Sequence, residues 1–240
     1  MALAGSGAVA IWHDIAPEGR EAFYAWHGEE HMPERVGIPG FRRGRRYVAL
    51  DADLEFFNLY ETATPAVLTG PDYLARLNAP TPRTVATVKH FRNVSRALCA
   101  VVASAGAGEG GLVATWRWFV AGDTAGLRAA LCAAVPALAT APGIAGAHAL
   151  VTDASASAIE TAERRARPDR NVTPACILLV EGWGDEDAFR AHAIALAREH
   201  AFTQAGEAPA PGVYRLQNAL ASPQPWNSRR PARSRTVTPP

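Results

Sequence analysis

The sequence of 240 residues has few cysteines, no excess of charge of either sign and no long hydrophobic run. Cys99, Cys132 and Cys176 show neither an even-numbered framework nor ligand spacing, so we interpret them as buried thiols of a reducing compartment. A formal net charge of +1 excludes a general attraction to nucleic acid or anionic membranes. No stretch approaches the roughly 18 apolar residues of a membrane span, and the N-terminus lacks the basic start of a signal peptide. We therefore expect a cytoplasmic protein without nucleic-acid or membrane partners.

What is present is an internal repeat. Three segments of the first half align in order with three of the second: VAIWHDI (9–15) with VATWRWF (113–119), PGFRRGRRYVALD (39–51) with PGIAGAHALVTD (142–153), and FFNLYETAT (56–64) with CILLVEGWG (176–184). The alignment places Trp12 on Trp116 and Glu61 on Glu181, and we interpret the two glutamates as structural. It requires a longer loop in the second copy, which TDASASAIETAERRARPDRNVTP supplies.

Each copy has the β-α-β-β-α-β pattern of a ferredoxin-like unit. We predict an α+β fold of two tandem repeats, 1–104 and 112–221, joined by a Gly-rich linker at 105–111 and followed by a disordered tail at 222–240. The predicted strands of the first copy are 8–15, 43–50, 55–62 and 96–104. In the second copy we expect strands in the segments 112–120, 142–153 and 176–184 and a last strand at 212–220. The predicted helices are 17–32, part of 65–90, 124–139 and 185–205. The linker matches G-x-G-x-x-G, but it opens a strand rather than the helix that a dinucleotide site requires.

Residues 27–31, HGEEH, admit two interpretations. The spacing fits the H-x-x-E-H zinc-peptidase motif, with His27 and His31 as ligands and Glu30 as the base. Against this, Pro33 disfavours helical geometry just before it, and no helical carboxylate pair follows downstream. We therefore expect no metal, a surface or supporting role for His27, and His31 in the last turn of its helix. The carbonyl end of a helix favours a protonated imidazole suited to general acid–base catalysis. The alternative for His31 is simple packing against Tyr47.

Strand alternation identifies further candidates. It places His13 on the face opposite Trp12, and puts Asn58 and Tyr60 on one face of their strand. Four arginines at 42–46 form either a solvated turn or a cluster in which Arg43 or Arg46 holds a substrate carboxylate. The predicted catalytic residues are His31, Tyr47 and Tyr60, and the predicted substrate-binding residues are Trp12, His13, Trp26, Arg43, Arg46 and Asn58.

The string F-x-x-W-x-x-x-E-H-M-P at 23–33, P-G-F at 39–41 and R-Y at 46–47 resembles the dimeric α+β barrel superfamily, in particular its EthD-type branch. The resemblance covers 8–104 and, in outline, 112–220. It implies two ferredoxin-like sheets placed face to face, here within one chain, with a pocket between sheet and helices. Relatives include muconolactone-type isomerases, cofactor-free monooxygenases, decarboxylases and cyclases of aromatic compounds, and haem enzymes.

The second copy replaces the histidines and glutamates of 23–41 mostly with alanine, so we expect one functional pocket, built mainly by residues 9–62. We favour an enzyme without metal or cofactor that acts on a small apolar or aromatic acid or carbonyl compound. Proton transfer by His31 would serve an isomerase, dehydratase, cyclase or decarboxylase. The alternatives are a non-catalytic binding or accessory protein of a catabolic pathway and, third, a cofactor-free or haem-dependent oxygenase, with His148 as the candidate haem ligand. We expect a monomer or homodimer.

Overall fold

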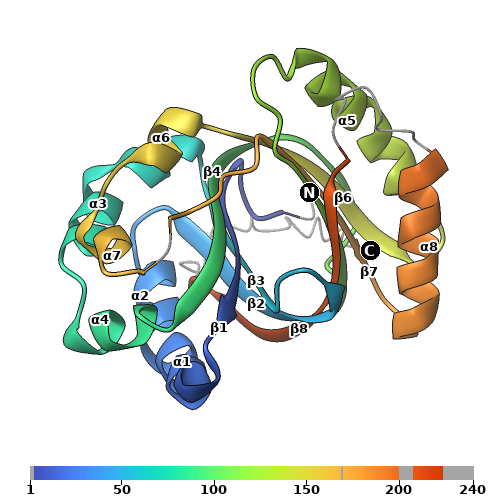
Figure 1. Ribbon diagram of the computed structural model, residues 1–240. Coiled ribbons are helices and arrows are strands. Elements are labelled where there is room, and N and C mark those ends of the chain that lie inside the picture. The colour runs from blue at the N-terminus through green and yellow to red at the C-terminus, as the bar shows by residue number, and fades with distance from the viewer. Residues whose placement is uncertain (1–2, 169, 200–207, 224–240) are drawn as a thin grey trace, which may run out of the picture.

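The computed structural model describes residues 3–168, 170–199 and 208–223 as an antiparallel barrel with helices outside it (Figure 1). The barrel is closed, in the order β1-β3-β2-β8-β5-β7-β6-β4. The strands are β1 (Gly7–Ile15), β2 (Phe41–Ala52), β3 (Phe56–Thr62), β4 (Phe91–Gly106), β5 (Leu112–Trp118), β6 (Ile144–Thr152), β7 (Cys176–Gly182) and β8 (Ala210–Ala221). Each half supplies four adjacent strands in the ferredoxin-like order, which confirms the predicted fold class. The two sheets join edge to edge through the β2–β8 and β4–β6 pairs.

Helices cover the outer faces of both sheets. On the first sheet lie η1 (Pro17–Gly19), α1 (Arg20–Trp26), the π-helical turn η2 (His27–His31), α2 (Met32–Val36), η3 (Pro65–Thr69), α3 (Pro71–Asn78) and α4 (Pro82–Val88). On the second lie α5 (Ala125–Leu138) and α8 (Glu186–Glu199), on the opposite side of the barrel in Figure 1. The predicted end of the first helix at Met32 is wrong. Pro33 stands in the first turn of α2, where its missing N–H is harmless, and the helix runs on to Val36.

Two predicted segments lie partly beyond the described residues. The helix predicted for 185–205 is described as α8, and 200–207 lie outside the description. The predicted disordered tail is described only at 222–223. Among the described residues, no helix combines the length and apolar character that crossing a membrane requires.

Strand alternation separates a barrel interior from an outer layer under the helices. Trp12, Tyr47 and Phe57 belong to the interior cluster, where the indole of Trp12 stacks on the ring of Phe57 at 4.6 Å. Phe23, Trp26, Phe56 and Phe91 pack in the outer layer of the first half, and the ring of His13 lies among them. The predicted opposite facing of Trp12 and His13 is thereby confirmed. Every residue of β3 is buried because helices cover one face and the barrel encloses the other.

Strand register corrects one part of the repeat alignment. Ala8 lies opposite Glu61, and Val113 lies opposite Glu181, so Trp12 occupies the position of Arg117 rather than Trp116. A shift of one residue moves a side chain to the other face of a strand, and Trp116 accordingly packs outside the barrel. The other two aligned segments keep their predicted register.

The barrel interior also holds a buried ionic network. The guanidinium of Arg45 donates to Glu181 at 2.7 and 2.9 Å and lies 3.0 Å from Glu61, while Arg43 donates to Glu61 at 2.7 and 2.8 Å. His148 occupies in the second half the position of Arg45 in the first, and its Nε2 lies 3.4 Å from Glu181. Arg45 therefore links one glutamate of each half across the barrel.

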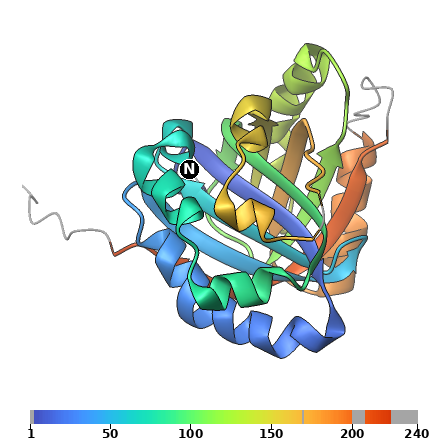
Figure 2. The same ribbon diagram turned by 60° about the vertical axis from the view of Figure 1, so that its left-hand side comes forward.

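The long loop of the second half crosses onto the first half. We call residues 153–168 and 170–175 the covering segment; it contains α6 (Ala154–Ala158) and α7 (Ala162–Arg165) (Figure 2). Val172 pairs in parallel with Ser95 of β4, and the backbone N–H of Ala162 donates to Asn78 Oδ1 at the end of α3. The loop was predicted, but its position over the helices of the other half was not.

Candidate functional site

A small cavity lies between the first sheet, the helical run 20–36 and the covering segment. We call it the histidine cavity; its volume is about 10 Å³, room for roughly one water molecule. Its lining residues are Ile11, Trp26, His27, His31, Asn58, Tyr60, Phe91 and Arg167. Six of these eight come from the predicted range 9–62.

The π-helical turn presents both histidines to this cavity. Their ring centroids are 5.5 Å apart, and the ring of His31 lies 4.2 Å from the indole of Trp26. A hydrogen bond holds the indole of Trp26 in place, because its N–H donates to Thr84 Oγ1 at 3.0 Å. Single π-helical turns inside α-helices are frequent at functional sites. HGEEH therefore forms an unusual turn in which both imidazoles point to the same side.

Tyr60 and His27 form a hydrogen-bonded pair at 3.0 Å between the phenol oxygen and Nε2. Burial raises the pKa of Tyr60 far above its usual range, so the phenol stays protonated, and either group can be the donor of this pair. The other ring nitrogen of His27, Nδ1, has no hydrogen-bond partner in the described part of the chain. Gly44 makes room for the phenol ring, since a Cβ there would lie 2.9 Å from it.

His13 positions Asn58 and is itself fully paired. Its Nδ1 lies 3.2 Å from the carbonyl oxygen of Asp14, and its Nε2 accepts from the side-chain amide of Asn58 at 2.9 Å. Burial lowers the pKa of His13 to about 3, so the ring is neutral. Asn58 Oδ1 finds no partner among the described residues and remains available to a cavity ligand.

His27 and His31 are also neutral, contrary to the prediction of a protonated imidazole. Burial lowers the pKa of His31 well below its usual value, and the charges of Arg35 and Arg167 lower it further. For His27, burial acts with the neighbouring His31 and Arg46 in the same direction. The prediction failed because the helix continues past His31, which leaves no free carbonyl end beside the ring, and because desolvation dominates at a buried position.

The expectation that all candidate residues share one pocket is wrong for three of them. Trp12, Arg43 and Tyr47 face the barrel interior, and the sheet separates them from His31. Tyr47 therefore does not pack against His31. Arg46 is on the outer face, where its guanidinium lies 5.0 Å from the ring centre of Tyr24 and its Nε donates to Gln217. His31, Tyr60, Trp26, Asn58 and His13 do come together.

Four residues that line the histidine cavity were not predicted as site residues, namely Ile11, His27, Phe91 and Arg167. His27 was expected to have a surface or supporting role, yet it is 2% exposed and lines the cavity, and its spacing of four residues from His31 was the available signal. Arg167 arrives from the covering segment, so no local pattern could have placed it here.

The residues do not match the metal or haem patterns considered from the sequence. The carboxylate of Glu30 turns away from the histidines and accepts from Thr81 Oγ1, with Arg83 nearby. No group of three or more His, Cys, Asp or Glu side chains within residues 3–168, 170–199 and 208–223 is placed to hold a metal ion. His148 is fully buried, with Ser104 on Nδ1 and Glu181 beside Nε2, so neither ring nitrogen faces a space that would admit haem.

Comparison with known proteins shows likeness of structure only. No protein-family model matches the sequence, and no curated protein matches it. A structure described as an anthrone oxidase-like protein superposes with a TM-score of 0.59 at 13% identity, covering 91% of this chain and 93% of that chain. A proposed monooxygenase from Fusobacterium nucleatum gives 0.54 at 10% identity, with coverage of 91% and 96%. One from Lactobacillus acidophilus gives 0.52 at 11% identity, with coverage of 90% and 97%. The chain thus has the fold of the dimeric α+β barrel proteins, formed here by two halves of one polypeptide.

Proposed function

We propose that the chain is an enzyme that removes a proton from a small, mostly aromatic carbonyl compound, with the neutral imidazole of His31 as the base. The observation that carries this proposal is the pair of neutral, buried histidines on a π-helical turn, each with an Nδ1 unpartnered among the described residues. A neutral imidazole accepts a proton directly. With the Tyr60 hydroxyl donating to His27 Nε2, His27 Nδ1–H can donate to a substrate carbonyl oxygen, and Asn58 Oδ1 can accept from a substrate hydroxyl. Trp26 and Phe91 supply an aromatic wall, and the cavity of about 10 Å³ has to widen by outward movement of the covering segment before it admits such a compound.

The structural relatives support dioxygen as the co-reactant. The names anthrone oxidase-like and monooxygenase belong to those proteins, and they support an oxygenase here over an isomerase or lyase. In the proposed reaction His31 takes a proton from an acidic CH₂ group, and the carbanion adds dioxygen. The resulting peroxide receives that proton and loses water, so that R₂CH₂ + O₂ gives R₂C=O + H₂O. Membership of the EthD-type branch is part of this proposal.

His31→Ala is expected to lower kcat/KM by roughly 10²–10⁴ while leaving substrate binding intact, because a general base typically contributes that factor. The measurement is oxygen uptake with an anthrone as substrate, alongside binding by calorimetric titration. His192→Ala on α8 is the matched control and should retain full activity. A wild-type protein that binds the anthrone but neither consumes oxygen nor exchanges the CH₂ protons under nitrogen would instead be a binding protein.

The pH profile tests the protonation state of the base. Because burial keeps His31 neutral, kcat/KM should stay constant between pH 8 and pH 6. A histidine with an ordinary pKa of about 6.5 would lose about three quarters of its base form by pH 6. Steady-state rates, with circular dichroism at each pH to verify folding, decide between the two. A midpoint near pH 6.5 would rule out His31 as a desolvated base.

A further inference from the structure

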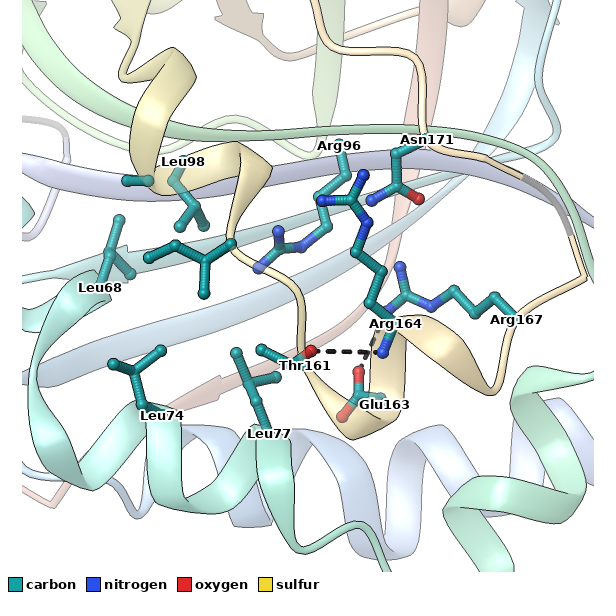
Figure 3. A pocket seen from close by; sticks show the side chains of 12 residues that line it. Leu68, Leu74, Leu77, Arg96, Leu98, Thr161, Glu163, Arg164, Arg167 and Asn171 are labelled. Carbon is teal, nitrogen blue, oxygen red and sulfur yellow. Dashed lines mark hydrogen bonds and ion pairs between the residues drawn. The ribbon is translucent and has the colours of Figure 1, made fainter.

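A second cavity adjoins the histidine cavity, with Arg167 lining both. It lies between β4, α3 and the covering segment and has a volume of about 20 Å³ (Figure 3). Figure 3 shows leucine side chains on one side of it and arginine side chains on the other. We call it the arginine cavity. Its lining residues are Leu68, Leu74, Leu77, Arg96, Leu98, Ala156, Ile159, Thr161, Glu163, Arg164, Arg167 and Asn171.

Buried positive charge exceeds buried negative charge around this cavity. Three arginines are buried here: Arg35 is 3% exposed, Arg96 is 8% exposed, and the side chain of Arg167 is 8% exposed. Arg35 and Arg167 share one buried carboxylate, that of Glu163. Glu34 also forms an ion pair with Arg35, but it pairs at the same time with the exposed Arg76. A buried charge without a counter-charge is costly. The balance of charge therefore favours an anionic ligand.

Arg96 and its neighbours have unused hydrogen-bonding groups. The guanidinium of Arg96 donates to the hydroxyl of Tyr73 at 3.1 Å and has no carboxylate partner among the described residues. Arg167 Nε and the amide nitrogen and oxygen of Asn171 are buried and have no hydrogen-bond partner among the described residues. Arg164 is already engaged, since it donates to the Ser157 carbonyl and pairs with the exposed Glu160. The groups still available are the remaining N–H groups of Arg96, the Nε–H of Arg167 and the amide of Asn171, which together suit a carboxylate.

We propose that the arginine cavity binds the carboxylate group of an apolar or aromatic acid, with Arg96, Arg167 and Asn171 as its partners. The inference rests on the proposed function, since it makes this acid the substrate of the histidine cavity. The leucines accommodate the apolar carbons next to the carboxylate. The present volume admits a water-sized group, so binding of a larger acid requires α6 and α7 to shift outward.

Calorimetric titration with benzoate, and with benzamide as its neutral isostere, tests the proposal. Benzoate should bind at least about tenfold more tightly than benzamide, and Arg96→Gln or Arg167→Gln should weaken benzoate roughly 10–100-fold. Arg92→Gln, on the same strand as Arg96, and Arg165→Gln, at the end of α7 two residues before Arg167, are matched controls that should leave the affinity unchanged. If either test variant fails to fold, Asn171→Ala replaces it, with an expected loss of about tenfold.

The outcomes separate this inference from the proposed function. Equal binding of benzoate and benzamide, no binding of either, or equal effects of Arg92→Gln and Arg96→Gln would overturn the carboxylate subsite. Benzoate binding that depends on Arg96, in a protein that oxidises no substrate, would support the subsite and reject the proposed function. Oxidation of a neutral ketone without inhibition by benzoate would overturn the subsite and leave the proposed function standing.

Discussion

Between pH 6.5 and pH 4.5 the free energy of unfolding is expected to fall by about 2.3 kcal/mol through the contribution of His13 alone. Burial lowers the pKa of His13 from 6.5 to about 3 in the folded protein. As the pH falls below 6.5, the unfolded chain takes up a proton on this ring and the folded chain does not, so stability decreases with decreasing pH. His27 and His31 act in the same direction, because burial lowers the pKa of both. Typical domains have only about 5–15 kcal/mol of stability, so this loss is substantial.

Urea unfolding at several pH values between 7.5 and 4.5 measures this dependence. His13→Phe removes a titrating ring from an aromatic environment and should reduce the slope of stability against pH. Asn58→Leu is the control, because it removes the partner of His13 and lowers stability while leaving the titrating ring in place. Burial raises the pKa of Glu34, so above about pH 4.5 this carboxyl makes stability decrease with increasing pH, opposite to the histidines. The slope of stability against pH near pH 6 is therefore the quantity to compare between the variants. Stability that is independent of pH in this range would contradict the neutral, buried histidines.

Arg45→Met is expected to destabilise the protein by about 3–5 kcal/mol, the usual effect of removing one partner of a buried ion pair. Arg45 is 1% exposed and contacts both Glu61 and Glu181 inside the barrel. Glu61 keeps Arg43 as a partner, but Glu181 loses its guanidinium. Burial alone would raise the pKa of Glu181, and it is His148 and Arg45 that lower it to about 2. Methionine fills the space of the side chain and leaves this carboxylate without its cation.

Denaturant unfolding of three variants separates the charge effect from the change of shape. Arg45→Met/Glu181→Leu should recover most of the lost stability, because an uncharged pair avoids the cost of burying an unpaired carboxylate. Arg83→Met is the matched surface control, since Arg83 and Glu29 form an exposed pair whose loss costs less than about 1 kcal/mol. Equal effects of Arg45→Met and Arg83→Met would show that the interior network is energetically unimportant.

Local patterns in the sequence were sufficient to predict the strands, the main helices and part of the candidate site. Alternation of period two placed His13 opposite Trp12, and helical spacing put His27 and His31 on one face, because both periodicities depend only on the backbone. The same local reasoning misaligned Trp12 with Trp116, because the alignment followed the similarity of VAIW and VATW. The true correspondence depends on strand register, which only the pairing with neighbouring strands fixes. It also ended a helix at Pro33, although proline is tolerated in a first turn.

The sequence by itself determined the α+β class, the two-copy order of strands and helices, and which residues share a strand or helix face. Only the tertiary structure decided which face of β2 and β3 lies inside the barrel, and so separated Tyr47 from Tyr60. It also decided the charge of the histidines, because protonation follows burial and neighbouring cations, which no local spacing encodes. Arg167 is the clearest case. It reaches the candidate site from the other half of the chain, through a segment whose docking depends on contacts with β4 and α3 that are distant in sequence.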